Sequence, residues 1–424
     1  MNLSEKLRAY VSNKQASDKR SDVPIKTKPY SEISTLLGAT TVNTPLGEHF
    51  VVEKSYPGSH IHGEIELNAI FNISGEIVKL IAKNCAYKDF DFSRAIFIDT
   101  ETTGLAGGTG TMAFLAGVGF FEGSSFKIKQ YFISDYDEEA AALYSLSDLL
   151  KNFDSFVSFN GKSYDIPLLS TRYMLNRMEN PVEKTFHLDL LAAARRLYRE
   201  RLESVSLSSL EENLLSLRRE GDIPGYEIPS VYFRFLRDRN PNSLKPIFYH
   251  NRMDILSMVS LTVNMAKSFK TPFDSKTCVN QDYYCLGRVF EDMGMIEQSI
   301  RCYEMALDVP EVQEKSYRQL SLLYKRLNCW EDAENLWIKM AKGNIDTVFA
   351  LEELAKYYEH KLKDYGKAAL ATQRALEIIY KKNTFIGYTL KDDICRFKKR
   401  LERIESKQEK NKSLFEKVSI LNNN

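Results

Sequence analysis

The segment that ends near residue 104 limits the possible folds more than any other part of the chain. Residues 96–98 form an apolar run that predicts a buried strand, and Asp99 and Glu101 follow it before the chain turns at residues 102–104. Alternate residues of a strand share a face, so we expect both carboxylates to point into one pocket. Burying two unpaired carboxylates is costly unless a cation neutralises them. The pattern therefore predicts half of a metal site at the end of a buried strand.

Length and composition are typical of a globular chain with more than one domain. The 424 residues suggest two or three domains, and a content of 43% hydrophobic and 27% charged residues is typical of a soluble protein. The sequence has no apolar run long enough for a membrane span, and its polar start lacks the apolar core of a signal peptide. We therefore expect a cytoplasmic protein without a membrane partner. Six cysteines without a C-x-x-C pair predict neither a zinc cluster nor a disulfide framework.

Basic residues are unevenly distributed, although the formal net charge is only +1. Arginines gather between residues 195 and 239, whereas the acidic residues are spread more widely. Two interpretations stay open for this segment. It forms either a solvated helix face or a basic rim around the acidic pocket, and such a rim would hold the backbone of a phosphodiester substrate.

The order of apolar patterns divides the chain into five parts. Residues 1–45 predict a flexible polar leader, and residues 46–92 predict a small β-rich element packed on the neighbouring α/β domain. Residues 93–270 predict that α/β domain, with a mixed central sheet flanked by helices, residues 278–410 only helices, and residues 411–424 a flexible tail. Within the α/β domain we expect strands at 94–99, 112–121, 126–133 and 155–159, and helices at 137–151, 164–178, 187–199, 206–217 and 245–269.

The helical part repeats itself. Tyr283 and Leu286 recur 34 residues later as Tyr317 and Leu320, and Leu320 recurs as Leu354. The pair at 306–307 returns at 375–376, which is two periods plus one inserted position. This spacing resembles the tetratricopeptide repeat, which implies a solenoid of stacked helical hairpins closed by a capping helix. A generic array of helical hairpins is the alternative.

Two further segments carry acidic residues at positions that suit a metal site. Asp165 opens a predicted helix just after a predicted strand, where it could equally act as a structural cap. His250 and Asp254 lie four residues apart and therefore on one face of the last predicted helix of the domain. Asn160 could bind either the protein backbone or a substrate sugar.

Taken together, these motifs resemble those of the ribonuclease H-like (DnaQ-like, four-acid) 3′–5′ exonuclease superfamily. The three exonuclease motifs correspond here to D-T-E-T-T-G at 99–104, N-x-x-x-Y-D at 160–165, and His250 with Asp254. The likeness covers about residues 94–268. With the repeats behind it, the whole chain resembles bacterial YprB-like proteins. The resemblance implies a ribonuclease H-like domain followed by an all-α tetratricopeptide-repeat solenoid.

The resemblance also implies a two-metal site that uses Mg²⁺ or Mn²⁺. Asp99, Glu101 and Asp254 would hold the ion that activates water, with Asp99 bridging to a second ion. Asp165 would hold that second ion directly or through water. His250, or alternatively Tyr249, would act on the water, because the usual spacing of His and Tyr before the last Asp is exchanged here.

Substrate contacts follow from the same resemblance. Thr102, Thr103 and Gly104 would line the terminal nucleotide, and Asn160 would contact the substrate. We therefore expect a nuclease that removes nucleotides from the 3′ end of single-stranded or frayed DNA or RNA, with a protein partner on the repeats. The competing hypothesis, motivated by the altered third motif, is a nuclease-like scaffold with little or no activity that acts through its repeats.

Overall fold

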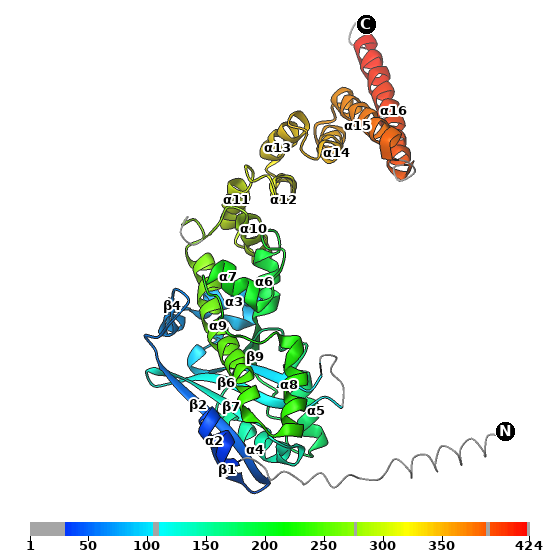
Figure 1. Cartoon of the computed structure of the whole chain (residues 1–424). Helices are drawn as coiled ribbons and strands as arrows, with labels where there is room; N and C mark the ends of the chain where they lie inside the picture. Colours follow the sequence, from blue (N-terminus) through cyan, green and yellow to red (C-terminus); the bar gives the residue numbers. More distant parts are fainter. Residues whose placement is uncertain (1–29, 105–109, 275–277, 387–390, 422–424) are drawn as a thin grey trace, which may run out of the picture.

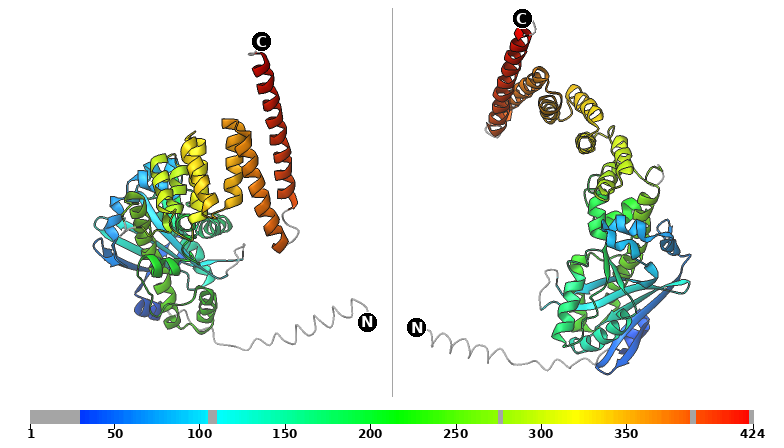
Figure 2. Two further views of the ribbon diagram at one scale, coloured as in Figure 1. Left: turned by 90° about the horizontal axis from the view of Figure 1, so that it is seen from above. Right: turned by 180° about the vertical axis from the view of Figure 1, so that it is seen from behind.

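The computed structural model describes residues 30–104, 110–274, 278–386 and 391–421. An α/β region with a mixed sheet comes first, and a series of helices extends away from it (Figures 1 and 2). This arrangement confirms the predicted fold class. No helix among the described residues is long and apolar enough to cross a membrane.

The central sheet has seven strands in the order β1-β2-β7-β6-β5-β8-β9. Their bounds are Ala39–Thr44 (β1), Gly47–Pro57 (β2), Ala95–Thr102 (β5), Ala113–Glu122 (β6), Ser125–Phe132 (β7), Ser155–Ser158 (β8) and Phe186–Asp189 (β9). Strands β5, β8 and β9 are mutually parallel, whereas β6 pairs antiparallel with β5 and β7 pairs antiparallel with β6. The carboxyl ends of the three parallel strands meet at one edge, which is where ligands bind in open α/β sheets. A separate pair joins β3 (Ile61–His62) and β4 (Ile65–Glu66).

Helices cover both faces of this sheet (Figure 1). They are α2 (Tyr30–Leu37), α3 (Gly75–Ala82), α4 (Glu139–Leu150), α5 (Asp165–Leu175), α6 (Leu190–Tyr198), α7 (Leu207–Leu214), α8 (Ile228–Asp238) and α9 (Lys245–Lys270). Short 3₁₀ turns are Leu67–Asn72, Cys85–Asp89, Phe92–Arg94, Tyr136–Glu138, Gly225–Glu227 and Pro241–Leu244. Helices α4 and α5 pack on Ile96 and Ile98 of β5, whereas α9 crosses the opposite face over β5, β6 and β7.

Two glycines of β6 let α9 lie close to the sheet. A Cβ atom added to Gly117 would stand 2.0 Å from Oδ1 of Asn251, and one added to Gly119 would stand 2.4 Å from Cγ2 of Ile255. A larger residue at either position would push α9 outward. These glycines therefore set the distance between the helix and the strand that carries the acidic motif.

The helical region follows α9. It consists of α10 (Asp282–Asp292), α11 (Ile296–Met305), α12 (Gln313–Arg326), α13 (Trp330–Lys342), α14 (Thr347–Tyr357), α15 (Tyr365–Ile386) and α16 (Lys391–Leu421). Each helix packs against the next along the chain. A π-helical turn, Tyr358–Leu362, extends α14 at the place where the sequence repeat gains one position. Identification of the helices as tetratricopeptide repeats stays a prediction.

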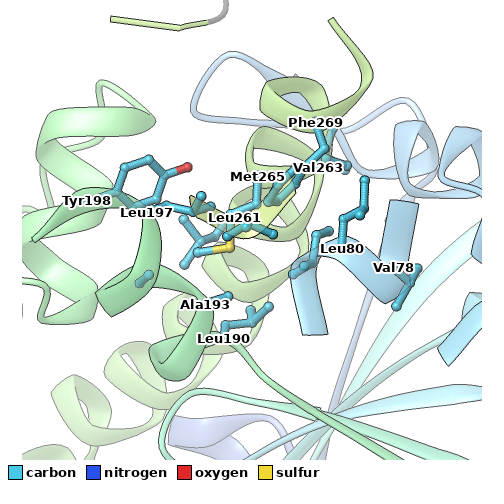
Figure 3. Packing of buried hydrophobic residues seen from close by; sticks show 14 of the residues in the cluster. Val78, Leu80, Leu190, Ala193, Leu197, Tyr198, Leu261, Val263, Met265 and Phe269 are labelled. Carbon is cyan, nitrogen blue, oxygen red and sulfur yellow. The ribbon is translucent and has the colours of Figure 1, made fainter. Parts of the chain in front are cut away.

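One hydrophobic core joins the α/β region to the first repeats. The same cluster of buried side chains includes Leu80 of α3, Leu197 of α6 and Phe269 of α9, and it continues through Tyr283 to Leu336 in the helical region (Figure 3). A second cluster, which contains Trp337, holds α13 to α16 together. The first helices of the helical region therefore pack directly on the α/β region.

The structure corrects several sequence expectations. Residues 30–44 form α2 and β1, so the leader does not extend to residue 45, and β2 pairs along β7 as part of the central sheet. Residues 1–29 of the expected leader lie outside the described residues. Strand β9 and helix α8 were not expected, and α16 continues to Leu421 where a tail was predicted. The remaining domain limits stay predictions.

Candidate active site

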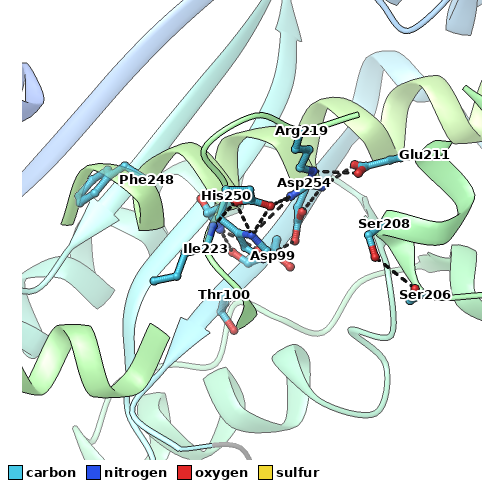
Figure 4. A network of polar contacts seen from close by, with 12 residues as sticks. Asp99, Thr100, Ser206, Ser208, Glu211, Arg219, Ile223, Phe248, His250 and Asp254 are labelled. Atoms are coloured by element: carbon cyan, nitrogen blue, oxygen red, sulfur yellow. Dashed lines mark hydrogen bonds and ion pairs between the residues drawn. The ribbon is translucent and has the colours of Figure 1, made fainter. Parts of the chain in front are cut away.

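The end of β5 directs its side chains to two sides of the sheet, as the alternation of a strand requires. Asp99 faces α9, where Asn251 binds it, whereas Thr100 points away from Asp99 (Figure 4). The same alternation puts Glu101 on the side of Asp99. The pairing of β5 with β6 shifts register between Glu101 and Thr102. Such a bulge next to a site re-aims the side chains beyond it. The carboxylate of Glu101 is buried and has no hydrogen-bond or ion-pair partner among the described residues.

Asp165 begins α5 beyond the short strand β8. Its Oδ1 accepts hydrogen bonds from the Thr100 backbone N at 3.0 Å and from the Thr100 Oγ1 at 2.5 Å. Burial raises the pKa of Asp165 to about 6, although the bonds from Thr100 oppose this change. Gly161 keeps the turn tight here, since an added Cβ would lie 3.2 Å from Oδ2 of Asp165. Asp165 is therefore attached to the strand that carries the other two acids.

Asn251 of α9 fixes the position of Asp99. Its Nδ2 donates to the Asp99 carboxylate at 2.8 Å and to the Asp99 carbonyl at 3.2 Å. Its own Oδ1 accepts from Nε2 of Gln130 on β7 at 2.9 Å, and Gln130 also donates to the carbonyl of Phe248. Both amides are fully buried. This relay orients Asp99 through hydrogen bonds that water cannot easily replace.

The third motif brings His250 and Asp254 to the same place, one turn of α9 apart. His250 Nε2 lies 3.6 Å from Oδ2 of Asp254, and its Nδ1 lies 2.9 Å from Oδ1 of Asp222. With Nδ1–H donating to Asp222, the Nε2 atom is left as the acceptor that faces Asp254. Tyr249 points elsewhere, and its ring packs 5.7 Å from the guanidinium of Arg252.

Arg219 connects the acids of this region (Figure 4). It contacts the Asp254 carboxylate directly, Asp222 at 3.1 Å, and Glu211 at 2.5 and 2.8 Å. Its side chain is only 7% exposed. Although burial opposes its charge, Asp254 and Glu211 raise the pKa of Arg219, so it stays a cation. One buried arginine thus serves three carboxylates.

Negative charge still exceeds positive charge at the end of β5. Burial raises the pKa of Asp99 well above its usual value, and the charges of Asp254, Glu101 and Asp165 raise it further. Burial likewise raises the pKa of Glu101, with additional contributions from Asp254 and Asp165 that Arg219 only partly offsets. The four carboxylates predicted as ligands are therefore close enough to disfavour each other's ionised form.

This donor set fits a hard divalent cation, since such ions prefer carboxylate oxygens and Glu101 has no partner to displace. The present conformation is not arranged for one, because no group of three or more His, Cys, Asp or Glu side chains among the described residues is placed to hold a metal. The carboxylates are instead bound by neighbouring side chains. Asn251, Thr100 and Arg219 each engage one of the carboxylates.

The turn after β5 is held by its own hydrogen bonds. The Gly104 carbonyl accepts from Thr102 Oγ1 at 2.8 Å and from Tyr164 Oη at 2.7 Å, and Thr103 Oγ1 accepts from the backbone N of Met112 at 3.0 Å. These hydroxyls thus have a structural role. Their contact with substrate stays a prediction.

An open cleft of about 570 Å³ lies beside the acids. Asp99 and Asp254 form one side, and Phe159, Asn160 and Arg195 lie among the other lining residues. The remaining lining residues come from α6, the start of α7 and the segment between them. Asn160 adopts a left-handed conformation with φ of 69°, and its backbone N donates to the Asp189 carboxylate that caps α6. Its side chain has no hydrogen-bond partner among the described residues.

Most of the arginines between residues 195 and 239 do not form a continuous rim. Arg201 pairs with Asp282 at 3.0 Å, Arg218 with Glu212 at 2.6 Å, and Arg239 with Asp135 at 2.6 Å. Only Arg195 of this group lines the cleft. The interpretation as a basic rim is therefore wrong for most of the segment.

Sequence reasoning missed three residues of the site. Asn251 lies one turn before Asp254 and shares its helix face, which is a local signal that could have identified it. The roles of Asp222 and Arg219 gave no such signal, because the motif residues that they contact, His250 and Asp254, lie 28 and 35 residues further along the chain.

Comparison with known proteins agrees with this geometry. The RNase_H superfamily model matches residues 96–266, which include all four acids. The uncharacterized protein YprB of Bacillus subtilis (strain 168) is 35% identical over 335 residues, which cover 76% of this chain and 79% of YprB. The segment matched by the superfamily model begins in β5 and ends in α9, the two elements that carry Asp99 and Asp254. Residues 96–266 thus form an RNase H superfamily domain, and the chain belongs to the same family as YprB.

Proposed function

We propose that this protein is a two-metal-ion nuclease that removes nucleotides from the 3′ end of single-stranded or frayed DNA or RNA. The gathering of four carboxylates from β5, α5 and α9 carries the proposal. Buried acids that raise one another's pKa destabilise a fold, and such groups cluster at functional sites. Proteins of the RNase H superfamily are generally metal-dependent nucleases.

The roles of the acids follow from their positions. Asp99, Glu101 and Asp254 would hold one ion, Asp99 would bridge to a second, and Asp165 would hold that second ion directly or through water. When bound, the ions supply activation of water and stabilisation of charge on the scissile phosphate. Arg219 would keep Asp254 in place, and Asn251 would orient Asp99.

His250 is the better candidate for the general base. Asp222 holds its Nδ1, so its Nε2 is free to accept a proton from the attacking water on the side of Asp254. Tyr249 has no hydrogen bond with the acids among the described residues, and its ring instead lies 5.7 Å from the guanidinium of Arg252. We therefore place the proton transfer at Nε2 of His250.

The cleft supports a nucleotide as the substrate. It offers a ring face at Phe159, an amide without a partner among the described residues at Asn160 and a cation at Arg195. Thr102, Thr103 and Gly104 lie at the end of the strand that carries the acids and would contact the terminal nucleotide. Recruitment of a protein partner by the helical region belongs to the same proposal.

The experiment compares three proteins on end-labelled substrates. Wild type, Asp99→Asn and the surface control Asp89→Asn are incubated with 5′-labelled single-stranded and blunt double-stranded DNA and RNA, with Mg²⁺ or Mn²⁺. Wild type and the control should give a ladder that shortens from the 3′ end. Asp99→Asn should lose about 100-fold or more in rate, because it removes an ion ligand that acts in the transition state. No cleavage with either metal, or equal cleavage by Asp99→Asn, would overturn the proposal.

A scaffold without activity is the second candidate, and one observation favours it. Arg219 forms an ion pair with the carboxylate of Asp254, so a cation of the protein already occupies a carboxylate that would have to bind the metal. Titration of Mn²⁺ followed by its electron paramagnetic resonance signal separates the two functions. Binding that Asp99→Asn abolishes supports the nuclease, whereas no binding by wild type supports the scaffold.

A further inference from the structure

A second cavity lies far along the chain from the acidic cleft. It has a volume of about 430 Å³ and lies between α12, α13, α14, the π-helical turn and α16 (Figure 1). Its lining includes five lysine or arginine side chains but only one acid, Glu353. Aromatic rings of Trp330, Trp337 and Tyr357 form the rest of its wall together with His360. The cavity is therefore positively charged and partly apolar.

Two hydrogen-bond donors in this wall have no partner among the described residues. The Nε1 atom of Trp337 and the Nη1 atom of Arg400 are buried and make no hydrogen bond in the described part of the chain. Trp337 itself is 0% exposed, so bulk water does not satisfy its N–H either. The carboxylate of Glu359 lies 3.7 Å from Arg400 Nη1, which is too long for a hydrogen bond. Buried donors without partners are costly, and two of them in one cavity indicate a missing acceptor.

The acids of the region are already engaged by other cations. Glu353 accepts from Lys325 at 2.5 Å and from Lys356 at 2.6 Å, and Glu359 accepts from Arg403 at 2.8 Å and from Lys407 at 2.7 Å. The ammonium of Lys361 has no carboxylate partner among the described residues. It lies 4.6 Å from the centre of the Trp330 ring. Cations thus outnumber acids in the lining by five to one, and Lys361 is the one of them without a carboxylate within ion-pair distance in the described part of the chain.

The aromatic rings favour an acidic peptide over a nucleic acid. The ring centroids of Trp330 and Tyr357 are 5.5 Å apart with nearly parallel planes, and the ammonium of Lys361 also lies over the Trp330 ring. Trp337 is fully buried and offers only its N–H edge. A nucleobase needs a free ring face on which to stack. A carboxylate needs what the cavity offers, namely an N–H donor, a guanidinium and an unpaired ammonium.

We propose that this cavity binds a carboxylate of an acidic peptide segment in a partner protein. Trp337 Nε1 and Arg400 Nη1 donate to its oxygens, and Lys361 adds charge at the rim. The π-helical turn supports this role, because such turns insert one residue and recur at functional sites. The inference specifies the partner of the proposed function, and it does not depend on nuclease activity.

The two tryptophans of the chain both line the cavity, so they report on it directly. The full chain is labelled with ¹⁵N-tryptophan, and its two indole N–H signals are followed in EDTA, where no cleavage occurs. The probes are a set of short peptides that place Asp or Glu among apolar residues, the same peptides with Asn or Gln, and single-stranded oligothymidylate and oligouridylate. Acidic peptides should shift the Trp337 signal downfield, and the amide peptides should not.

Variants test the donors themselves. Arg400→Gln should weaken binding of the acidic peptides by about 10-fold or more, as expected for loss of a charged hydrogen-bond donor. The matched control is Arg396→Gln, since Arg396 lies one turn earlier on α16 and binds Glu352 and Asp393 outside the cavity. Trp337→Phe removes the N–H donor and keeps an aromatic ring. If Trp337→Phe does not fold, Arg400→Gln decides the result.

Three outcomes would overturn the proposal. Acidic peptides that bind no more tightly than about 1 mM would show that the cavity does not hold a carboxylate. Equal binding of amide peptides would show that charge is irrelevant. Binding of the oligonucleotides alone, with a shift of the Trp337 signal, would assign the cavity to nucleic acid. None of these results bears on the cleavage assay, so failure of this inference and failure of the nuclease are separable.

Discussion

The acidic cleft and the cavity of the helical region are opposites in charge. In the cleft of the α/β region, one cation, Arg219, is shared by Glu211, Asp222 and Asp254, and acids remain in excess. In the helical region, one acid, Glu359, is shared by Arg403 and Lys407, and donors remain in excess. The first arrangement requires added positive charge and the second requires an added anion. The two proposed sites therefore call for ligands of opposite charge.

The largest expected effect comes from removing the shared cation of the cleft. Arg219→Ala leaves three carboxylates without their common partner, of which Glu211 is 1% exposed. We expect a loss of about 3–5 kcal/mol in the free energy of unfolding, as for other broken buried ion pairs. Urea unfolding followed by circular dichroism measures it.

The neighbouring residue provides the control. Arg218 pairs with Glu212 at the surface and is 82% exposed, so Arg218→Ala should change stability by less than about 0.5 kcal/mol. Similar effects of the two substitutions would show that Arg219 is not the organiser of the acids.

Removal of the shared acid of the helical region should have a smaller, pH-dependent effect. Burial opposes the charge of Glu359, but its hydrogen bonds with Arg403 and Lys407 dominate and lower its pKa to about 2. A lowered pKa gives stability that is present above the unfolded value of 4.5 and is lost as pH falls towards 2. Glu359→Gln should therefore destabilise the chain near pH 7 and differ little from wild type near pH 2. Melting temperatures across this range test it, and a constant difference would contradict the assigned charge state.

The smallest expected effect is a gain. Glu101 is buried without a partner among the described residues and is repelled by Asp254, so Glu101→Gln should stabilise the protein by about 1 kcal/mol in EDTA at pH 8. Saturating Mn²⁺ should reverse the order, because only wild type keeps the ligand. A loss of stability in EDTA would mean that the acid already has a partner, and the contrast between the two cavities would weaken.

Local patterns allowed much of the fold to be predicted from the sequence. The apolar run before Asp99 is a strand because β-branched and aromatic residues are continuous there, and the helix that carries Asp254 is long and periodic. Strand β9 was missed because its four residues are too few to show a period. Helix α8 begins with a proline in its first turn, which a helix tolerates but which reads locally as a break.

Only part of the candidate site could be predicted from local sequence patterns. Motif spacing identified the four acids and His250, since each lies beside a recognisable strand or helix end. The role of Arg219 depends on contacts with residues 211, 222 and 254, and such contacts become visible only in three dimensions. The sequence left two interpretations of the surrounding arginines open, because partners such as Asp282 of Arg201 and Asp135 of Arg239 are likewise distant in the chain.

The division of the hydrophobic core has a consequence for how the molecule responds to stress. Residues from β5 to α12 share one cluster, and α13 to α16 share another that meets it at Leu336 and Trp337. Cooperative units of this kind open separately. The terminal helices can detach and reform while the α/β region keeps its shape, so a partner that clamps them would gain residence time without altering the cleft. Truncation of the chain after α9, in contrast, would expose apolar side chains of the first cluster to water and make the remaining protein prone to aggregate.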